Sequence, residues 1–84
     1  MYSLVFDEKA IAFLEKLPKE IAQRIYKKIN TTKKEPFHYF ERLEGREDYK
    51  LRVGDYRVIG NILQSEKKIE IILIGHRKNI YKKI

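Results

Sequence analysis

The chain has 84 residues, of which 43% are apolar and 37% charged, and it contains no cysteine. This length provides one modest hydrophobic core, so we expect a single domain over residues 1–84, and the composition excludes disulfides and cysteine-ligated zinc. The formal net charge is +7, and residues 46–84 contribute most of it with ten basic and five acidic groups. A surface this basic predicts a phosphate-rich partner.

The sequence carries no targeting signal that we can identify. No run approaches the roughly 20 apolar residues of a membrane span, and the first ten residues lack the basic and then apolar layout of a signal peptide. The lack of cysteine agrees with a reducing compartment. We therefore expect a cytoplasmic protein.

The first half of the chain predicts a strand followed by two helices. Residues 2–6 form a short apolar run that stops at Asp7, a residue that favours the N-cap position of a helix. Apolar residues then recur at helical spacing on both sides of Pro18, which ends the first helix and opens the second. The two stripes consist of Ala10, Ile11, Phe13, Leu14 and Leu17, and of Ile21, Ala22, Ile25, Tyr26 and Ile29. Helices joined so closely form a hairpin that covers one side of a sheet.

The second half predicts an antiparallel sheet. Residues 33–47 have no clear period and include Pro36 and Gly45, so we expect a long connection held down by its aromatic side chains. Gly54-Asp55 then signals a two-residue hairpin turn. Strands are expected at residues 49–53, 56–63 and 67–74. The predicted fold class is α+β, in the order β-α-α-β-β-β, with both helices packed on one face of a three-stranded antiparallel meander.

A tight turn at Gly54-Asp55 fixes the register of the hairpin, and the register decides which side chains share a face. It sets Arg52 opposite Arg57. The helix-facing side is expected to comprise Leu51, Val53, Tyr56, Val58, Gly60, Ile62, Ile69, Ile71 and Leu73. The opposite side is expected to comprise Lys50, Arg52, Arg57, Ile59 and Asn61, with Ile72 and Ile74 as its apolar floor. Two arginines in direct opposition repel each other, and a bound polyanion would convert that repulsion into binding free energy.

Each of these residues also has an ordinary structural interpretation. Charges such as Lys50 and Arg52 on an outward face commonly serve solubility, whereas Arg57 in the central strand is harder to explain without a ligand. Arg77 could be a strand-end charge that faces water, and Tyr81 could simply pack on the sheet edge. Only two histidines are present, far apart in sequence, so we expect no metal site.

Several short motifs, in this order along the chain, resemble one toxin family. They are Pro36-Phe37, Arg42–Gly45, Lys-Leu-Arg at 50–52, Tyr-Arg-Val-Ile at 56–59 and Gly-His-Arg-x-x-x-Tyr at 75–81. With the opening strand and the helices that meet at Leu17-Pro18, they make nearly the whole chain similar to the RelE branch of the RelE/ParE toxin superfamily. Members of that branch are ribosome-dependent messenger-RNA endonucleases of toxin–antitoxin pairs. The resemblance implies cleavage of messenger RNA in the ribosomal A site, by attack of a ribose 2′-hydroxyl on the adjacent phosphate, without a metal or other cofactor.

The resemblance also implies catalytic roles for four residues. Arg57 would stabilise the transition state, and Arg77 would neutralise or protonate the leaving oxygen. Lys50 would hold a phosphate and bias nearby pKa values, while Tyr81 would act as the base or stack on a nucleobase. A phenol is a poor base at neutral pH, because its pKa is about 10 unless neighbouring cations lower it.

Four further residues are expected to contact RNA, namely Arg52, His76, Lys78 and Lys82. His76 is also a secondary candidate for proton transfer, because the pKa of an imidazole suits neutral pH. One position departs from the family pattern: Asp48 stands where some members carry a further lysine. We expect either that Arg52 compensates or that the activity is weaker.

Two other functions remain open from the sequence. A ParE-like toxin would share the fold but inhibit DNA gyrase by binding it, and a catalytically inactive module would bind nucleic acid without cutting it. The resemblance further implies a small antitoxin that wraps this chain and supplies most of the DNA contact. Given the charge of +7, we expect the wrapping segment to be acidic.

Overall fold

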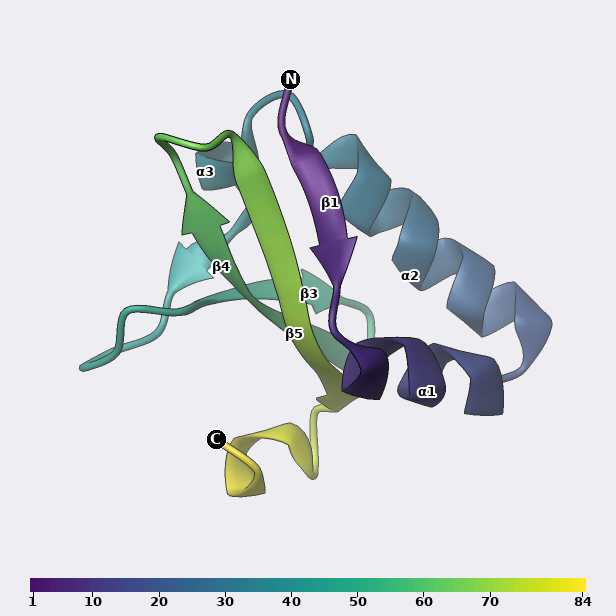
Figure 1. Cartoon of the computed structure of the whole chain (residues 1–84). Helices are drawn as coiled ribbons and strands as arrows, with labels where there is room; N and C mark the ends of the chain where they lie inside the picture. Colours follow the sequence, from purple (N-terminus) through teal and green to yellow (C-terminus); the bar gives the residue numbers. More distant parts are fainter.

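The computed structural model describes residues 1–84 and consists of helices packed on a five-stranded sheet (Figure 1). In chain order the elements are β1 (Ser3–Phe6), α1 (Glu8–Lys16), α2 (Lys19–Thr31), α3 (Pro36–Tyr39), β2 (Glu41–Arg42), β3 (Tyr49–Val53), β4 (Tyr56–Leu63), β5 (Lys68–His76) and a 3-10 helix, η1 (Ile80–Lys82). The strand order is β1-β5-β4-β3-β2, with β1 parallel to β5 and all other neighbours antiparallel. The predicted α+β fold is confirmed, and β1 and the short β2 form the two edges of the sheet.

The helical hairpin forms where the sequence predicts it. Asp7 is the N-cap of α1, and its carboxylate accepts a hydrogen bond of 2.9 Å from a backbone N–H in the first turn. Pro18 precedes α2 directly, so the two helices are joined almost without a loop. Ala10, Ile25 and Ile29 are fully buried against the sheet. The two helices therefore cover one face and leave the other face free for different side chains.

The β3–β4 hairpin has the predicted register. The pairs include Lys50 with Ile59, Leu51 with Val58, Arg52 with Arg57 and Val53 with Tyr56. Gly54 has a φ of +57°, which the tight turn requires and glycine adopts without strain. Because Leu51 and Val58 are buried under the helices, their neighbours Arg52 and Arg57 lie on the opposite face.

A β-bulge interrupts the pairing of β4 with β5. Ile59 pairs with Leu73 whereas Gly60 pairs with Ile71, so Ile72 is an extra residue on β5. The two strands approach closely here, because a Cβ on Gly60 would lie 2.6 Å from a backbone carbonyl oxygen of β5. Only glycine fits that approach.

The bulge overturns two expectations about the last strand. Ile74 was expected on the outer face, but it is buried in the main core under the helices. Leu73 was expected to face the helices, but it packs on the outer face beside Ile59. The physical reason is the extra residue, which exchanges the inward and outward positions for the rest of the strand.

The segment 33–47 holds more regular structure than expected. Pro36 does not interrupt it but occupies the first turn of α3, where a missing N–H leaves no bond unmade. Phe40 is buried, and the next residue, Glu41, starts β2 and pairs with Lys50 of β3. The connection therefore supplies an edge strand beside the basic residues of the hairpin.

The last strand is also displaced along the chain from its expected bounds. Lys67 lies in the preceding turn with a φ of +55°, and β5 continues as far as His76. Gly75 thus lies inside the strand. A Cβ there would lie 2.7 Å from Cδ1 of Ile80, so the missing side chain makes room for η1 to pack on the sheet.

A second, smaller apolar cluster forms on the outer face. Leu43, Ile59 and Ile80 are buried in it, and Leu73 and Ile84 pack against them. The segment after β5 therefore folds back onto the sheet, far from α2 (Figure 1).

The longest helix, α2, has only 13 residues and carries several charged side chains, and none of the helices is long and apolar enough to span a bilayer.

Candidate functional site

A small cleft on the outer face brings together residues from five elements. It has a volume of about 200 Å³ and is lined by Tyr39, Glu41, Lys50, Arg52, Arg57 and Tyr81. We call it the basic cleft. Three of its residues are the adjacent cations of the β3–β4 hairpin, and the fold-back of η1 adds Tyr81 from the far end of the chain. Four of the eight predicted site residues thus share one cavity.

The three cations of the cleft have no acidic partner. None of the three ion pairs in the structure includes Lys50, Arg52 or Arg57. Arg57 is half-buried, and its Nη1 donates hydrogen bonds of 2.9 Å to the carbonyl oxygens of Gly54 and Tyr56. Its remaining nitrogens make no hydrogen bond to protein. The guanidinium is therefore held in place with donors left over for a ligand.

Arg77 lies beside the basic cleft and does not line it. Its backbone N–H donates to the carbonyl oxygen of Asp55 at 2.8 Å, and its Nε lies 3.5 Å from the Asp55 carboxylate. Asp55 belongs to the same turn that holds Arg57. Arg77 is more than half exposed, so its long side chain has water around it and can reorient.

The other predicted RNA-binding residues lie outside the cleft. His76 pairs with Tyr56 and packs edge-on against that ring with 5.5 Å between ring centroids, so it lies on the helix-facing side of the sheet. Its Nδ1 accepts a hydrogen bond of 3.2 Å from the backbone N–H of Lys78. The side chains of Lys78 and Lys82 are exposed on the segment that follows β5. The structure thus separates His76 from the cations by the thickness of the sheet.

Sequence reasoning missed two lining residues, Tyr39 and Glu41. Both belong to the segment that was expected to be an irregular connection. The pattern that could have identified them is alternation, because the buried Phe40 lies between the two cleft residues. Tyr39 also lies under the ammonium group of Lys28, 5.1 Å from its ring centroid, which helps to fix the ring at the cleft edge.

Asp48 adds no uncompensated negative charge to the outer face. Its two carboxylate oxygens accept hydrogen bonds of 2.8 and 2.9 Å from Nε and Nη2 of Arg46. These bonds, assisted by the charge of Arg46, lower the pKa of Asp48 although partial burial opposes the shift. Arg46 is in turn positioned by its carbonyl oxygen, which accepts a bond of 3.1 Å from Nε of Arg42. The residue that departs from the family pattern is thus neutralised locally.

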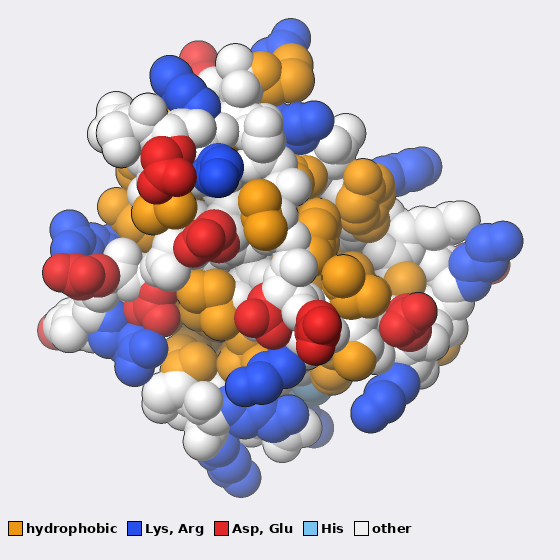
Figure 2. Space-filling view, viewed as in Figure 1, with side chains coloured by type: hydrophobic (Ala, Val, Ile, Leu, Met, Phe, Trp, Pro, Cys, Tyr) orange, Lys and Arg blue, Asp and Glu red, His pale blue; other side chains and the backbone are white.

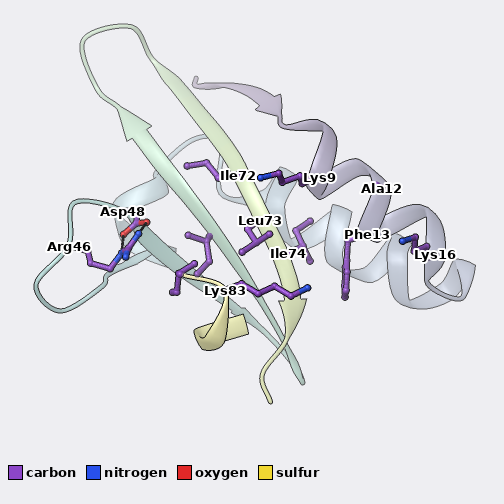
Figure 3. A pocket seen from close by; sticks show the side chains of 12 residues that line it. Lys9, Ala12, Phe13, Lys16, Arg46, Asp48, Ile72, Leu73, Ile74 and Lys83 are labelled. Carbon is purple, nitrogen blue, oxygen red and sulfur yellow. Dashed lines mark hydrogen bonds and ion pairs between the residues drawn. The ribbon is translucent and has the colours of Figure 1, made fainter. Parts of the chain in front are cut away.

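A larger groove of about 540 Å³ lies next to this region, between α1 and the end of the chain. Figure 3 shows Ile72, Leu73 and Ile74 of β5 along it, with Phe13 on one side and Lys83 on the other. On the face of the molecule seen in Figure 2, apolar side chains are exposed among charged ones. We call this hollow the apolar groove. Its basic residues are Lys9, Lys16, Arg46 and Lys83.

The basic cleft offers three cations, the hydroxyl groups of two tyrosines and one carboxylate. No three His, Asp or Glu side chains lie close enough together to hold a metal ion. Three cations around one cavity can bind a phosphodiester and stabilise the extra negative charge of a pentacovalent phosphorus. The geometry suits phosphate chemistry on a polyanion.

Comparison with known proteins identifies the family. Residues 4–81 match the family model for the ParE toxin of type II toxin–antitoxin systems. The chain belongs to this family. It is therefore a toxin of a type II toxin–antitoxin system, of the RelE/ParE kind that its motifs resemble. No curated protein sequence gives a significant match.

Solved structures of RelE toxins are similar to this ParE-family toxin over most of their length. The RelBE2 complex from Mycobacterium tuberculosis has a chain with 25% identity and a TM-score of 0.80, covering 90% of this chain and 98% of that one. The RelE–RelB complex from Pyrococcus horikoshii gives 28% identity and a TM-score of 0.78, covering 90% and 94%. A chain of the intact RelBE complex from E. coli has 26% identity and a TM-score of 0.75, and the match covers 90% of this chain and 96% of that one. These similarities confirm the predicted superfamily and its RelE-like branch.

Proposed function

We propose that this toxin is a ribosome-dependent endoribonuclease that cleaves messenger RNA in the ribosomal A site and so inhibits translation. The single observation that supports this most is the basic cleft, in which Lys50, Arg52 and Arg57 lie together without acidic partners. An unpaired cation cluster is costly unless a polyanion neutralises it. The solved structures named above are of RelE toxins, which agrees with RNA as that polyanion.

The chemistry follows from the charges. Attack of a 2′-hydroxyl on the adjacent phosphorus forms a transition state with additional negative charge on the phosphoryl oxygens. Arg57, held by the turn, stabilises that charge, while Lys50 and Arg52 bind the flanking phosphates. Arg77 reaches from the edge of the cleft toward the leaving 5′-oxygen, and Tyr81 contributes the group for proton transfer or stacking. His76, Lys78 and Lys82 contact RNA or ribosome outside the cleft.

The experiment that tests this function maps messenger-RNA 5′ ends after induction of the toxin in cells. Wild type is expected to produce new 5′ ends within translated codons, and Arg57→Ala and Arg77→Ala to reduce them at least about 100-fold. Lys68→Ala is the matched control, because Lys68 is exposed at the far end of β5 and pairs only with Glu66 at 3.6 Å. Intact messenger RNA at ribosome-occupied codons with wild-type toxin would exclude the proposal.

Inhibition of DNA gyrase is the second candidate function, because the matching family model describes a ParE toxin. In that case the outer face would bind gyrase and no RNA would be cut. A supercoiling assay with purified gyrase separates the two candidates: an RNA endonuclease leaves supercoiling unchanged at toxin concentrations that abolish translation.

We also propose a cognate antitoxin with an acidic, partly apolar segment that binds in the apolar groove. Several of the similar structures are complexes of a RelE toxin with a RelB antitoxin. The groove in this chain has an apolar floor and a rim with Lys9, Lys16 and Lys83, which complements a helix with leucines and glutamates. Binding is expected to weaken with salt and with Lys9→Glu/Lys16→Glu. Affinity that is independent of both would count against an acidic segment.

A further inference from the structure

Three arginines from different parts of the chain converge on the turn between β3 and β4. Arg57 donates from Nη1 to the carbonyl oxygen of Gly54 at 2.9 Å. Arg77 is attached to Asp55 by a backbone hydrogen bond of 2.8 Å. The third is Arg24 of α2: a Cβ added to Gly54 would overlap its Nη2 and lie 3.3 Å from its Cζ, so its guanidinium rests directly on the glycine. The turn thus carries three guanidinium groups and a single carboxylate, that of Asp55.

Arg24 is exposed, and its guanidinium has no partner in the protein. None of the side-chain hydrogen bonds or ion pairs includes it. Glu20 lies one helical turn earlier on α2, at a spacing that favours an ion pair, yet the two side chains do not pair and Arg24 extends to the turn instead. Its N–H donors are therefore open to a ligand, at a place where Arg57 and Arg77 add to the positive potential.

We propose that Arg24 binds a phosphate of the messenger RNA on the 3′ side of the cut, and so extends the phosphate-binding surface from the basic cleft around the hairpin turn. The inference deepens the proposed function and depends on it. In that function Arg77 acts on the leaving 5′-oxygen, which belongs to the nucleotide 3′ of the cut. Because Arg77 is attached to Asp55, that nucleotide lies at the turn. The strand that continues from it meets Arg24 on Gly54, the other residue of the turn.

The competing interpretation is that Arg24 only covers the turn and helps to fix its conformation. In that case the loss of Arg24 would shift Arg57 and Arg77, and the rate of the chemical step would fall. A phosphate contact has a different signature, because its loss weakens binding of RNA and reduces the dependence of that binding on salt. The two roles therefore give different kinetic results.

The test is single-turnover cleavage on programmed ribosomes at several concentrations of toxin and of salt. Arg24→Gln is expected to raise the half-saturating toxin concentration about five- to tenfold and to leave the rate at saturation within about twofold of wild type. The slope of log affinity against log salt concentration is expected to become shallower by about 0.7, the value for one phosphate contact on a single strand. Arg24→Lys keeps the charge and is expected to recover most of the affinity.

Lys34→Gln is the matched control, because it also removes one positive charge from an exposed residue. The chain next to Lys34 lies far from the turn: the carbonyl oxygen of Lys33 accepts a hydrogen bond of 2.8 Å from Tyr2, which precedes β1 beside the start of β5. The hairpin turn lies beside the end of β5. Lys34→Gln is therefore expected to keep the wild-type affinity and salt dependence.

Messenger RNAs with one uncharged methylphosphonate linkage, placed at successive positions 3′ of the cut, locate the phosphate. At one position wild type is expected to lose as much affinity as Arg24→Gln does, and Arg24→Gln to lose nothing further there. If the two effects multiply at every position, the message holds no phosphate that Arg24 binds, and the proposal is overturned. A slower rate at saturation with an unchanged salt slope would show that Arg24 only supports the turn, which also overturns it. If wild type itself cuts no RNA, the proposed function fails and not merely this assignment.

Discussion

Arg57 and Arg77 are held by the two residues of a single turn. Arg57 donates from Nη1 to the carbonyl oxygen of Gly54 at 2.9 Å, and the backbone N–H of Arg77 donates to the carbonyl oxygen of Asp55 at 2.8 Å. The second arginine also has its Nε 3.5 Å from the Asp55 carboxylate. The hairpin turn therefore sets the relative positions of two cations that are 20 residues apart in sequence (77 minus 57).

The first prediction concerns the acidic residue of that turn. Asp55→Asn keeps a residue suited to the turn but removes the ion pair with Arg77. Because the pair is exposed, we expect the cleavage rate to decrease only about two- to fivefold and the midpoint of thermal unfolding to stay unchanged. The measurement is cleavage on programmed ribosomes, and Glu66→Gln, which breaks the exposed pair with Lys68, is the control. A loss as large as that of Arg77→Ala would show that Asp55 has a direct role.

The second prediction concerns the packing of η1 on the sheet at Gly75. Gly75→Ala would bring a methyl group to 2.7 Å from Cδ1 of Ile80, so we expect it to displace η1 and with it Tyr81. The expected result is a decrease in the free energy of unfolding of about 1–3 kcal/mol and a loss of cleavage. Ile80→Val removes the clashing methyl, and the double variant is expected to recover both stability and activity relative to Gly75→Ala. A double variant no better than the single one would show that the glycine acts in another way.

The third prediction concerns the bulge. Gly60→Ala would place a methyl group 2.6 Å from a backbone carbonyl oxygen, and a backbone atom of a central strand cannot rotate away as a side chain can. We expect a loss of at least about 2–3 kcal/mol of stability, measured by urea unfolding. No side-chain truncation should rescue this variant, in contrast to Gly75→Ala. Asn61→Ala, one residue along on the same strand, is the control.

The fourth prediction concerns pH. The hydrogen bonds from Arg46 lower the pKa of Asp48 in the folded protein, so the pair stabilises the fold above the unfolded-state value of about 3.9 and the contribution disappears as the pH falls below it. Asp48→Asn should therefore lower the midpoint of thermal unfolding slightly at pH 7 and not at all near pH 2. Glu47→Gln is the control, and an equal effect of Asp48→Asn at both pH values would contradict the assignment.

The sequence predicts the hairpin better than any other element, because two independent signals agree there. Gly54-Asp55 defines the turn, and alternation across β3 and β4 then allows only one register. The helical spacing of apolar residues in α1 and α2 identifies the two helices, but it does not show how wide a stripe of each helix is buried. Ile11 and Tyr26 carry the helical period, yet they are 44% and 50% exposed.

The features that the sequence did not predict share a physical cause: each of them depends on contacts between residues that are distant in sequence. The bulge follows from the close approach of Gly60 to β5, and no local pattern in residues 67–74 contains that information. β2 exists only because β3 offers it an edge, so the position of Glu41 could not be derived from its neighbours in the chain. The fold-back of η1 likewise depends on the space above Gly75.

The extra residue at Ile72 has a consequence for how relatives should be aligned with this chain. Before it, odd-numbered residues of β5 such as Ile69 and Ile71 face the helices, and after it the even-numbered Ile74 does. A homologue without the bulge would be one residue shorter at this point and would still keep every buried side chain in place. Gaps of one residue within β5 should therefore be assigned to position 72, because a gap assigned two residues later would align Leu73 with a residue of the homologue that faces the helices.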